Sequence, residues 1–274
     1  YYISRQEFRD KCKSNGIDNG DIQTWLLEWF NDLGECFSYS FGEEEPAPDM
    51  DLKVLNPEWL TNAIYIIIRE AGDLAVNGFI THEGIRNKLD HSDKGTLKNV
   101  SYTEAECNYV LEVMRKFRLS YKVRGRSEEF IPALLRENMP SDLDVGGYVN
   151  VISYEMKYKY IPESVIHNLM IMMYPYLDYH RCWRKGVVID VRGVRNLGLY
   201  AVLDMSHDDE ILSINVYSYA NHAPWELLQE IRSTLLDINS HMNLDFDEFI
   251  VINDTERVSV DELLLLLKRI KMRY

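Results

Sequence analysis

The stretch that most constrains the fold is Leu55-Asn56-Pro57-Glu58-Trp59-Leu60. Asn56 is a good N-cap, because its side-chain oxygen can accept hydrogen bonds from the free N–H groups of a first helical turn. Pro57 suits the first helical position, where its missing N–H is not needed. A helix is therefore expected to start here and to continue through Glu70. Its apolar residues recur at spacings of three and four, which predicts one broad buried face: Trp59, Leu60, Ala63, Ile64, Ile67 and Ile68.

This helix carries no side chain arranged for metal or acid–base chemistry, and most of the chain shares that property, which favours an interaction module over an enzyme. The 274 residues predict about two domains at about 100 to 200 residues each. The net charge of −14 would repel phosphate backbones and anionic membranes unless a local basic patch overrides it. No apolar run approaches the ~18 residues of a membrane span, and no signal peptide opens the chain. Neither nucleic acid nor membrane is an expected partner.

The four cysteines are scattered and form no C-x-x-C pair. This spacing argues against a zinc site or a disulfide framework and favours a reducing, cytoplasmic location. The chain starts at Tyr1 rather than Met, which suggests a fragment of a longer protein.

The first half reads as helical. Capping boxes at 4–7 and 103–106 each predict a helix start, because the hydroxyl and the glutamate satisfy each other's backbone N–H groups. Between these two helix starts, a short strand is predicted at 78–80, followed by a helix that Thr81 caps. A hairpin around Gly125 is predicted after the helix that starts at 103–106. Helix, short strand, helix, helix and hairpin is the order of a winged helix.

A second amphipathic helix is predicted from Asp21 to Leu33, with Gly34 suited to a left-handed C-cap. One face of this helix collects its apolar side chains: Ile22, Trp25, Leu26, Trp29, Phe30 and Leu33.

Winged-helix modules often bind DNA through the third helix and the wing, where Lys122, Arg124 and Arg126 would lie. On the presumed reading helix, however, three glutamates balance three cations, so no basic stripe forms. Residues 1–147 hold 17 basic and 26 acidic residues, a net charge of −9. A winged-helix nucleic-acid-binding regulator is therefore the alternative and not the preferred hypothesis. The wing cations suit a solvated turn or an acidic partner equally well.

Residues 141–147 are polar and contain two adjacent glycines, which suggests a hinge. We therefore expect an α+β protein with a helical, winged-helix-like subdomain at 1–147 and an antiparallel-sheet subdomain at 148–274. The second subdomain is predicted to contain strands at 148–158, 182–191, 197–205, 211–219 and 249–252. Two helices are predicted to start at prolines, at 162–173 and 224–240, and an amphipathic helix is predicted at 260–272.

The motifs of common enzymes are missing. The chain contains no Gly-Lys dipeptide and hence no P-loop, and no G-x-G-x-x-G, H-E-x-x-H or G-x-S-x-G. Asp190-Val191-Arg192 is only faintly similar to the acidic-x-Lys element of metal nucleases, because arginine replaces the lysine. We therefore assign no catalytic, cofactor-binding or metal-ligating residues.

Several segments, in order along nearly the whole chain, resemble the COR domain of Roco proteins. In the first half these are L-N-P-E-W-L at 55–60, G-F-I-T at 78–81, V-M-R-K-F at 113–117 and F-I-P-A-L-L at 130–135. In the second half, Y-E-M at 154–156, Y-I-P at 160–162 and W-R-K-G-V at 183–187 are similar to the family's tyrosine-bearing strand, its proline-started helix and its W-R-x-G strand.

The resemblance implies a non-catalytic module that follows a Ras-like Roc GTPase domain in a leucine-rich-repeat Roco protein. GTP, GDP and magnesium would then belong to that Roc domain and not to this chain. The COR module would form a homodimer through its C-terminal subdomain and couple the dimer to the nucleotide state. By this likeness Tyr154 matches the tyrosine that faces the Roc domain, and ordinary sheet packing is the other interpretation of this residue.

Overall fold

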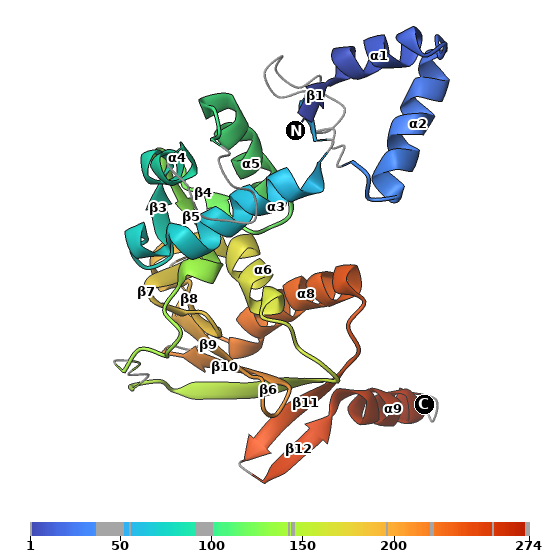
Figure 1. Ribbon diagram of the computed structural model, residues 1–274. Helices are drawn as coiled ribbons and strands as arrows, with labels where there is room; N and C mark the ends of the chain where they lie inside the picture. The colour runs from blue at the N-terminus through green and yellow to red at the C-terminus, as the bar shows by residue number, and fades with distance from the viewer. Residues whose placement is uncertain are drawn as a thin grey trace. The chain divides into compact units, whose positions relative to one another are not determined.

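The computed structural model describes residues 2–36, 52–54, 56–90, 101–141, 143, 146–195, 197–219, 222–253 and 255–271. Leu55 of the opening motif lies outside these residues. The chain forms two compact units: unit 1 comprises Tyr1–Ala75, Ile80–Phe117 and Lys122–Glu129, and unit 2 comprises Val76–Phe79, Arg118–Tyr121 and Phe130–Tyr274. A helical N-terminal part precedes a sheet-rich C-terminal part, which confirms the predicted α+β class (Figure 1). The boundary at 147 stays a prediction.

Unit 1 begins with a small helical hairpin. It consists of α1 (Arg5–Ser14) and α2 (Gly20–Asp32), beside a two-stranded antiparallel sheet of β1 (Tyr2–Ser4) and β2 (Leu52–Val54). The capping box predicted at the start of α1 is present. The core of this hairpin is small, with four buried residues: Phe8, Cys12, Leu27 and Cys36.

The predicted central helix begins where Asn56 and Pro57 place it. α3 (Pro57–Tyr65) starts with the Asn56 side chain accepting from the Glu58 N–H at 2.9 Å. The prediction of one continuous α-helix to Glu70 is wrong, because α3 passes into a π-helical turn, η2 (Ile66–Glu70), where the Ala71 N–H bonds to the carbonyl of Ile66. A π turn rotates the following side chains relative to an α-helix. Ile66 and Ile67 are fully buried here, whereas Ile64 and Ile68 are half-buried.

Trp59 anchors the core of unit 1, as predicted, and is 1% exposed. Its ring packs against Tyr102 with centroids 5.0 Å apart. The Tyr102 hydroxyl donates to the Trp59 carbonyl at 2.9 Å and accepts from the Asn62 amide at 3.0 Å. This arrangement satisfies the buried polar groups on the inner side of α3.

The remaining elements of the first half follow the predicted order. After η3 (Gly72–Leu74) come β3 (Phe79–Thr81), α4 (His82–Asp90), α5 (Glu104–Lys116), β4 (Tyr121–Lys122), β5 (Glu128–Phe130) and η4 (Pro132–Leu134). The capping box at Thr103 opens α5. The three short strands form a sheet in the order β3-β5-β4. The winged-helix assignment itself stays a prediction.

Unit 2 contains a seven-stranded antiparallel sheet in the order β12-β11-β6-β10-β9-β8-β7. Its strands are β6 (Asn150–Tyr158), β7 (Leu177–Trp183), β8 (Gly186–Asp190), β9 (Leu199–Ser206), β10 (Ile211–Ser218), β11 (Phe246–Asn253) and β12 (Glu256–Ser259). Its helical segments are α6 (Ser164–Met172), η5 (Tyr174–Tyr176), α7 (Arg192–Arg195), α8 (Pro224–Met242) and α9 (Val260–Lys271).

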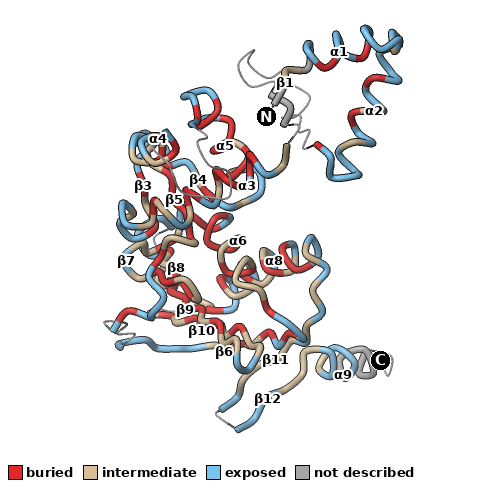
Figure 2. The backbone as a smooth tube through the Cα atoms, in the orientation of Figure 1, coloured by how far each residue is buried: buried red, intermediate tan, exposed pale blue. Residues whose placement is uncertain are grey.

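Helices α6 and α8 pack on one face of this sheet (Figure 1). Figure 2 shows the buried residues concentrated in the central strands and on the inner sides of these helices. Because facing strands place opposite residues on the same side, the register assigns Met156, Ile214 and Leu203 to the helix-covered face. All three are buried. The same register assigns Val151, Tyr217 and Tyr200 to the opposite face.

One predicted strand is a hairpin. The run at 182–191 divides into the end of β7 and β8, with a tight turn at Arg184 and Lys185. Gly186 makes this turn possible, because the ring of Trp183 lies over it and a Cβ at this position would meet Trp183 Cζ2 at 2.1 Å. The turn residues Arg184 and Lys185 are not one of the usual two-residue hairpin pairs such as Asn-Gly, so the sequence did not separate the two strands.

Among the described residues, none of the helices combines the length and the apolar character that crossing a bilayer requires.

Candidate interaction surfaces of the sheet-rich unit

Tyr154 lies in the middle of β6 on the helix-covered face and is 3% exposed. Its hydroxyl accepts from Arg232 Nε of α8 at 3.1 Å and donates to Glu248 Oε1 of β11. Arg232 also bonds both oxygens of Glu248, at 2.7 and 2.6 Å. Tyr154, Arg232 and Glu248 therefore form one hydrogen-bonded triad that joins β6, α8 and β11.

The electrostatics of the triad stabilise this arrangement. Burial, followed by the hydrogen bond to Glu248, raises the pKa of Tyr154 above its usual value, so the phenol stays protonated and can donate. The hydrogen bonds to Glu248 likewise raise the pKa of Arg232. The side chain of Arg232 is 35% exposed and that of Glu248 is 16% exposed. The triad is thus buried at the tyrosine and open to a partner at the arginine.

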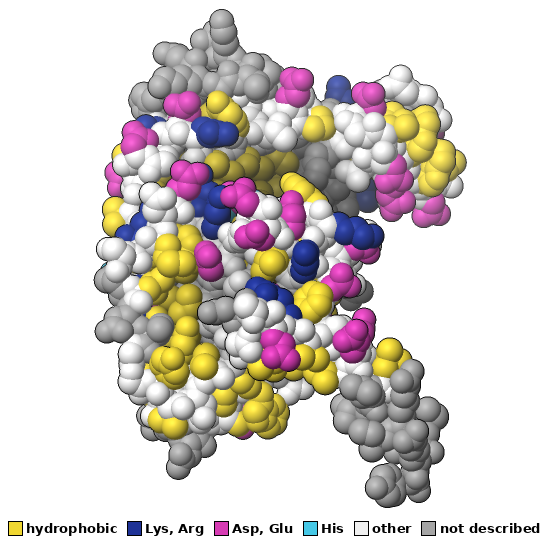
Figure 3. All heavy atoms as spheres, turned by 90° about the horizontal axis from the view of Figure 1, so that it is seen from below, with side chains coloured by type: hydrophobic (Ala, Val, Ile, Leu, Met, Phe, Trp, Pro, Cys, Tyr) yellow, Lys and Arg dark blue, Asp and Glu magenta, His cyan; other side chains and the backbone are white. Residues whose placement is uncertain are grey.

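The opposite face of the sheet presents apolar side chains to solvent. On it, at the start of β6, Val149 is 63% and Val151 is 43% exposed. Tyr148, 45% exposed, packs against Tyr217 of β10 with ring centroids 5.1 Å apart. We call these four residues the open-face patch. Figure 3, which views the molecule from below, shows hydrophobic side chains in yellow gathered over part of this surface.

The open face becomes polar toward β12. Ser153 of β6 donates to Asn215 of β10 at 2.7 Å. Arg257 of β12 donates to both oxygens of Glu155, at 2.5 and 3.1 Å. Together they line a shallow hollow of about 260 Å³. The apolar patch therefore has a polar rim, which is the composition that protein–protein interfaces usually have.

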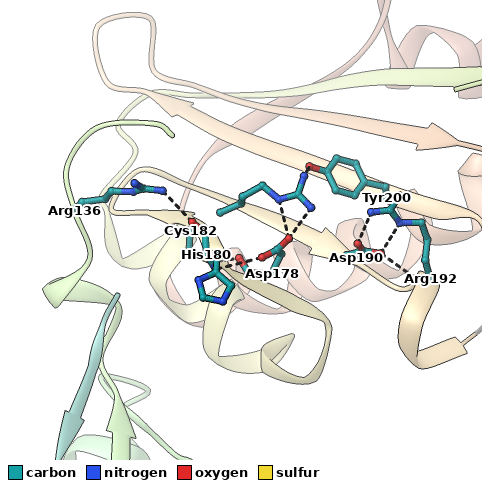
Figure 4. Close-up of polar contacts among 8 residues, drawn as sticks. Arg136, Asp178, His180, Cys182, Asp190, Arg192 and Tyr200 are labelled. Atoms are coloured by element: carbon teal, nitrogen blue, oxygen red, sulfur yellow. Dashed lines mark hydrogen bonds and ion pairs between the residues drawn. The ribbon is translucent and has the colours of Figure 1, made fainter. Parts of the chain in front are cut away.

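At the β7–β9 side of the sheet, two arginine–aspartate pairs flank Tyr200 (Figure 4). Arg181 bonds Asp178 at 2.7 Å and donates to the Tyr200 hydroxyl at 2.9 Å. Arg192 makes three hydrogen bonds to Asp190, at 2.6 to 3.0 Å, and its guanidinium lies 5.2 Å from the centre of the Tyr200 ring. Asp190 is thus engaged with Arg192, and its pKa is lowered by these bonds although burial opposes them. Each cation is matched by an anion, so the cluster suits a structural role.

In the part of the chain that the structure describes, no group of three or more His, Cys, Asp or Glu side chains is placed to hold a metal ion.

Family models match both halves of the chain. The model "C-terminal of Roc, COR-A domain" matches residues 1–135, and the model "C-terminal of Roc, COR-B domain" matches residues 149–273. This chain belongs to the COR family of Roco proteins. The two models follow each other in order and span nearly the whole sequence, and the resemblance seen in the sequence motifs is thereby confirmed.

Relatives of this COR chain occur in bacteria and amoebae. It is 27% identical over 277 residues to a Roc-COR-CHAT protease of Runella zeae, covering 95% of this chain and 26% of that protein. It is 23% identical over 208 residues to the "Probable serine/threonine-protein kinase qkgA" of Dictyostelium discoideum, covering 69% of this chain and 12% of that protein. The chain therefore spans about a quarter or less of the length of these relatives.

Among solved structures, that of Methanosarcina barkeri Roco2 RocCORdC bound to GDP matches with 24% sequence identity and a TM-score of 0.40. The match covers 49% of this chain and 39% of that one.

The predicted wing of the COR-A half is a short exposed hairpin. Lys122, Arg124 and Arg126 are all exposed around Gly125, whose φ is +75°. Arg126 pairs with Glu128 at 3.6 Å. The three cations therefore lie on one exposed turn, and contact of the wing with an acidic partner stays a prediction.

The COR-A half also contains a buried ionic cluster that sequence reasoning missed. Glu129 of β5 is fully buried and bonds Arg115 of α5, with Nε at 3.1 and 3.3 Å from its two oxygens. His82 Nε2 lies 2.9 Å from Glu129 Oε1, and Arg115 also bonds Glu112. No local sequence pattern indicated this cluster, because its members come from three separate elements, α4, α5 and β5.

Proposed function

We propose that this COR chain is a non-catalytic dimerisation and coupling module of a Roco GTPase. Its C-terminal half pairs two protomers, and its contact with the Roc domain of the same polypeptide links the dimer to the nucleotide state. GTP, GDP and magnesium belong to that Roc domain in this proposal. The proposal also places this chain in the cytoplasm.

The observation that carries the proposal is the open-face patch. Soluble proteins seldom expose adjacent large apolar side chains unless another surface covers them. The patch lies at the start of β6 and on the facing strand β10, and a polar rim borders it toward β12 at Ser153, Glu155 and Arg257. A second copy, related by a two-fold axis, would present the same patch in return, which is the arrangement of most homodimers.

The coupling part of the proposal rests on strand β6. Val151 and Tyr154 lie three residues apart on this strand and point to opposite faces of the sheet. Val151 belongs to the open-face patch, whereas Tyr154 holds Arg232 and Glu248 on the helix-covered side. A partner that moves Arg232 would shift the triad, and the shared strand would transmit the shift to the dimer surface. Energetic linkage of this kind acts equally in both directions.

We predict that the double variant Val149→Asp, Val151→Asp dissociates the dimer. Two carboxylates per protomer would face each other across the two-fold axis, where desolvation and repulsion cost at least about 2 kcal/mol, or about 30-fold in affinity. Sedimentation velocity from about 1 to 100 μM provides the measurement.

The matched control is Val194→Asp, which places a carboxylate at a valine on α7 that is 60% exposed and lies outside the open-face patch. It should leave the dissociation constant unchanged. A wild-type chain that stays monomeric throughout this range, or equal dissociation in the double variant and the control, would contradict the assignment of the patch.

A further inference from the structure

Helix α2 presents an exposed apolar stripe in the COR-A half. Four large side chains along it are exposed: Ile22 by 51%, Trp25 by 60%, Trp29 by 45% and Leu33 by 55%. At about 100° per residue they lie within about 80° of one another around the helix, so they form a straight ridge. The rings of Trp25 and Trp29 stack with centroids 6.0 Å apart and planes 3° from parallel. Figure 2 shows most of α2 as exposed.

The other side of α2 already serves the hairpin core. Leu27 and Gln23 are buried there, and Leu26 and Phe30 pack against Phe8, Cys12 and Cys36. The exposed stripe is therefore additional to the face that folds the hairpin. Its rigid aromatic side chains are of the type that dominates binding energy at protein interfaces.

A row of carboxylates runs beside the stripe. By the same helical geometry Asp21, Glu28 and Asp32 lie within about 40° of one another, on the side of the stripe away from the hairpin core. All three are exposed, and within the described residues none forms an ion pair. In Figure 3 the α1–α2 hairpin, at the upper right, shows hydrophobic side chains in yellow beside acidic ones in magenta. This surface attracts a cationic partner and repels phosphate groups.

We infer that α2 is a docking surface for an amphipathic helix of a partner protein, with an apolar ridge flanked by Lys or Arg. The ridge from Ile22 to Leu33 is about 17 Å long, which is three turns of a partner helix lying alongside. The partner's apolar ridge covers the two tryptophans, and its cations meet the carboxylate row. This surface is independent of the open-face patch and of the triad at Tyr154.

The test uses the whole chain and a synthetic 18-residue Leu/Lys amphipathic helix as the probe, with a Leu/Glu peptide of the same pattern as its counterpart. Binding is followed by anisotropy of the labelled peptide and by the blue shift of tryptophan emission. The Leu/Lys peptide should bind, and Trp25→Ala with Trp29→Ala should weaken binding at least 10-fold. The variant Asp21→Asn, Glu28→Gln, Asp32→Asn should weaken it at least 5-fold and reduce its salt dependence.

Two matched controls test whether binding depends on this surface or only on the acidity of the chain and on any exposed tryptophan. Trp225→Ala removes a tryptophan of α8 that is 55% exposed, and Asp208→Asn, Asp247→Asn, Asp261→Asn neutralises three exposed carboxylates elsewhere. Both should bind the peptide as the wild type does.

Four results would overturn the inference. The first is equal binding of the Leu/Glu peptide, and the second is equal loss of affinity in the controls. The third is protection of Trp25 and Trp29 from acrylamide in the free chain, which would mean that the chain covers its own stripe. The fourth is a homodimer that the double tryptophan variant dissociates, because the occupant would then be a second copy.

Discussion

Replacing Arg115 by methionine is expected to destabilise the first unit by about 3 to 5 kcal/mol. The Glu129 carboxylate is fully buried, and Arg115 supplies most of the hydrogen bonds to its two oxygens. Methionine keeps the apolar stem but removes the permanent positive charge beside the buried carboxylate, which then keeps, among the described residues, only the contact with His82. Urea unfolding, followed by circular dichroism and by the emission of the tryptophans that include buried Trp59, measures the loss.

The double variant Arg115→Met, Glu129→Leu provides the control. Removing both charges removes the desolvation cost together with the attraction, so its stability should return to within about 1 kcal/mol of the wild type. A double variant as unstable as Arg115→Met would contradict this explanation, and the cause would then be lost packing around the arginine stem.

Gly186→Ala is expected to destabilise the second unit by about 3 kcal/mol or more. The added Cβ would lie 2.1 Å from Trp183 Cζ2 and 2.5 Å from the carbonyl oxygen of Leu203. The backbone of Leu203 cannot move away as the end of a flexible side chain could. Trp183 is itself buried in a cluster with Val188 and Tyr200, so its ring has little room to move. The melting temperature should fall by about 6 to 12 °C.

Gly193→Ala is the matched control, because a Cβ at that glycine of α7 would have no heavy atom within 4 Å. It should leave the melting temperature almost unchanged. Equal melting temperatures for the two alanine variants would show that Trp183 and its strand can move aside.

Local sequence rules predicted much of the fold. Asn56 with Pro57 set the start of α3, and the capping boxes at Ser4 and Thr103 set the starts of α1 and α5. These signals act within one turn of helix, so no knowledge of tertiary contacts is needed. Where tertiary packing decided the outcome, local rules were insufficient. The π turn after Tyr65 and the hairpin at Gly186 are the two examples.

The candidate surfaces were only partly predictable. Tyr154 was singled out by the resemblance, but its partners Arg232 and Glu248 lie 78 and 94 residues away, and no local pattern points to them. Contact of Tyr154 with a Roc domain stays a prediction. Likewise, the periodicity of α2 predicted an apolar face, but periodicity does not state which surface covers it. The exposure of Trp25 became visible only in the structure.

The central proposal is that the dimer of this module and the nucleotide state of a Roc domain are linked. The most direct test is the dimer dissociation constant of a polypeptide that joins a Roc domain to this COR chain, measured by sedimentation with GDP and with a non-hydrolysable GTP analogue. The two constants should differ by about 10-fold, within the usual range of coupling energies. Tyr154→Phe, which removes the hydroxyl of the triad, should reduce that difference. Equal dissociation constants in the two nucleotide states would contradict the proposal.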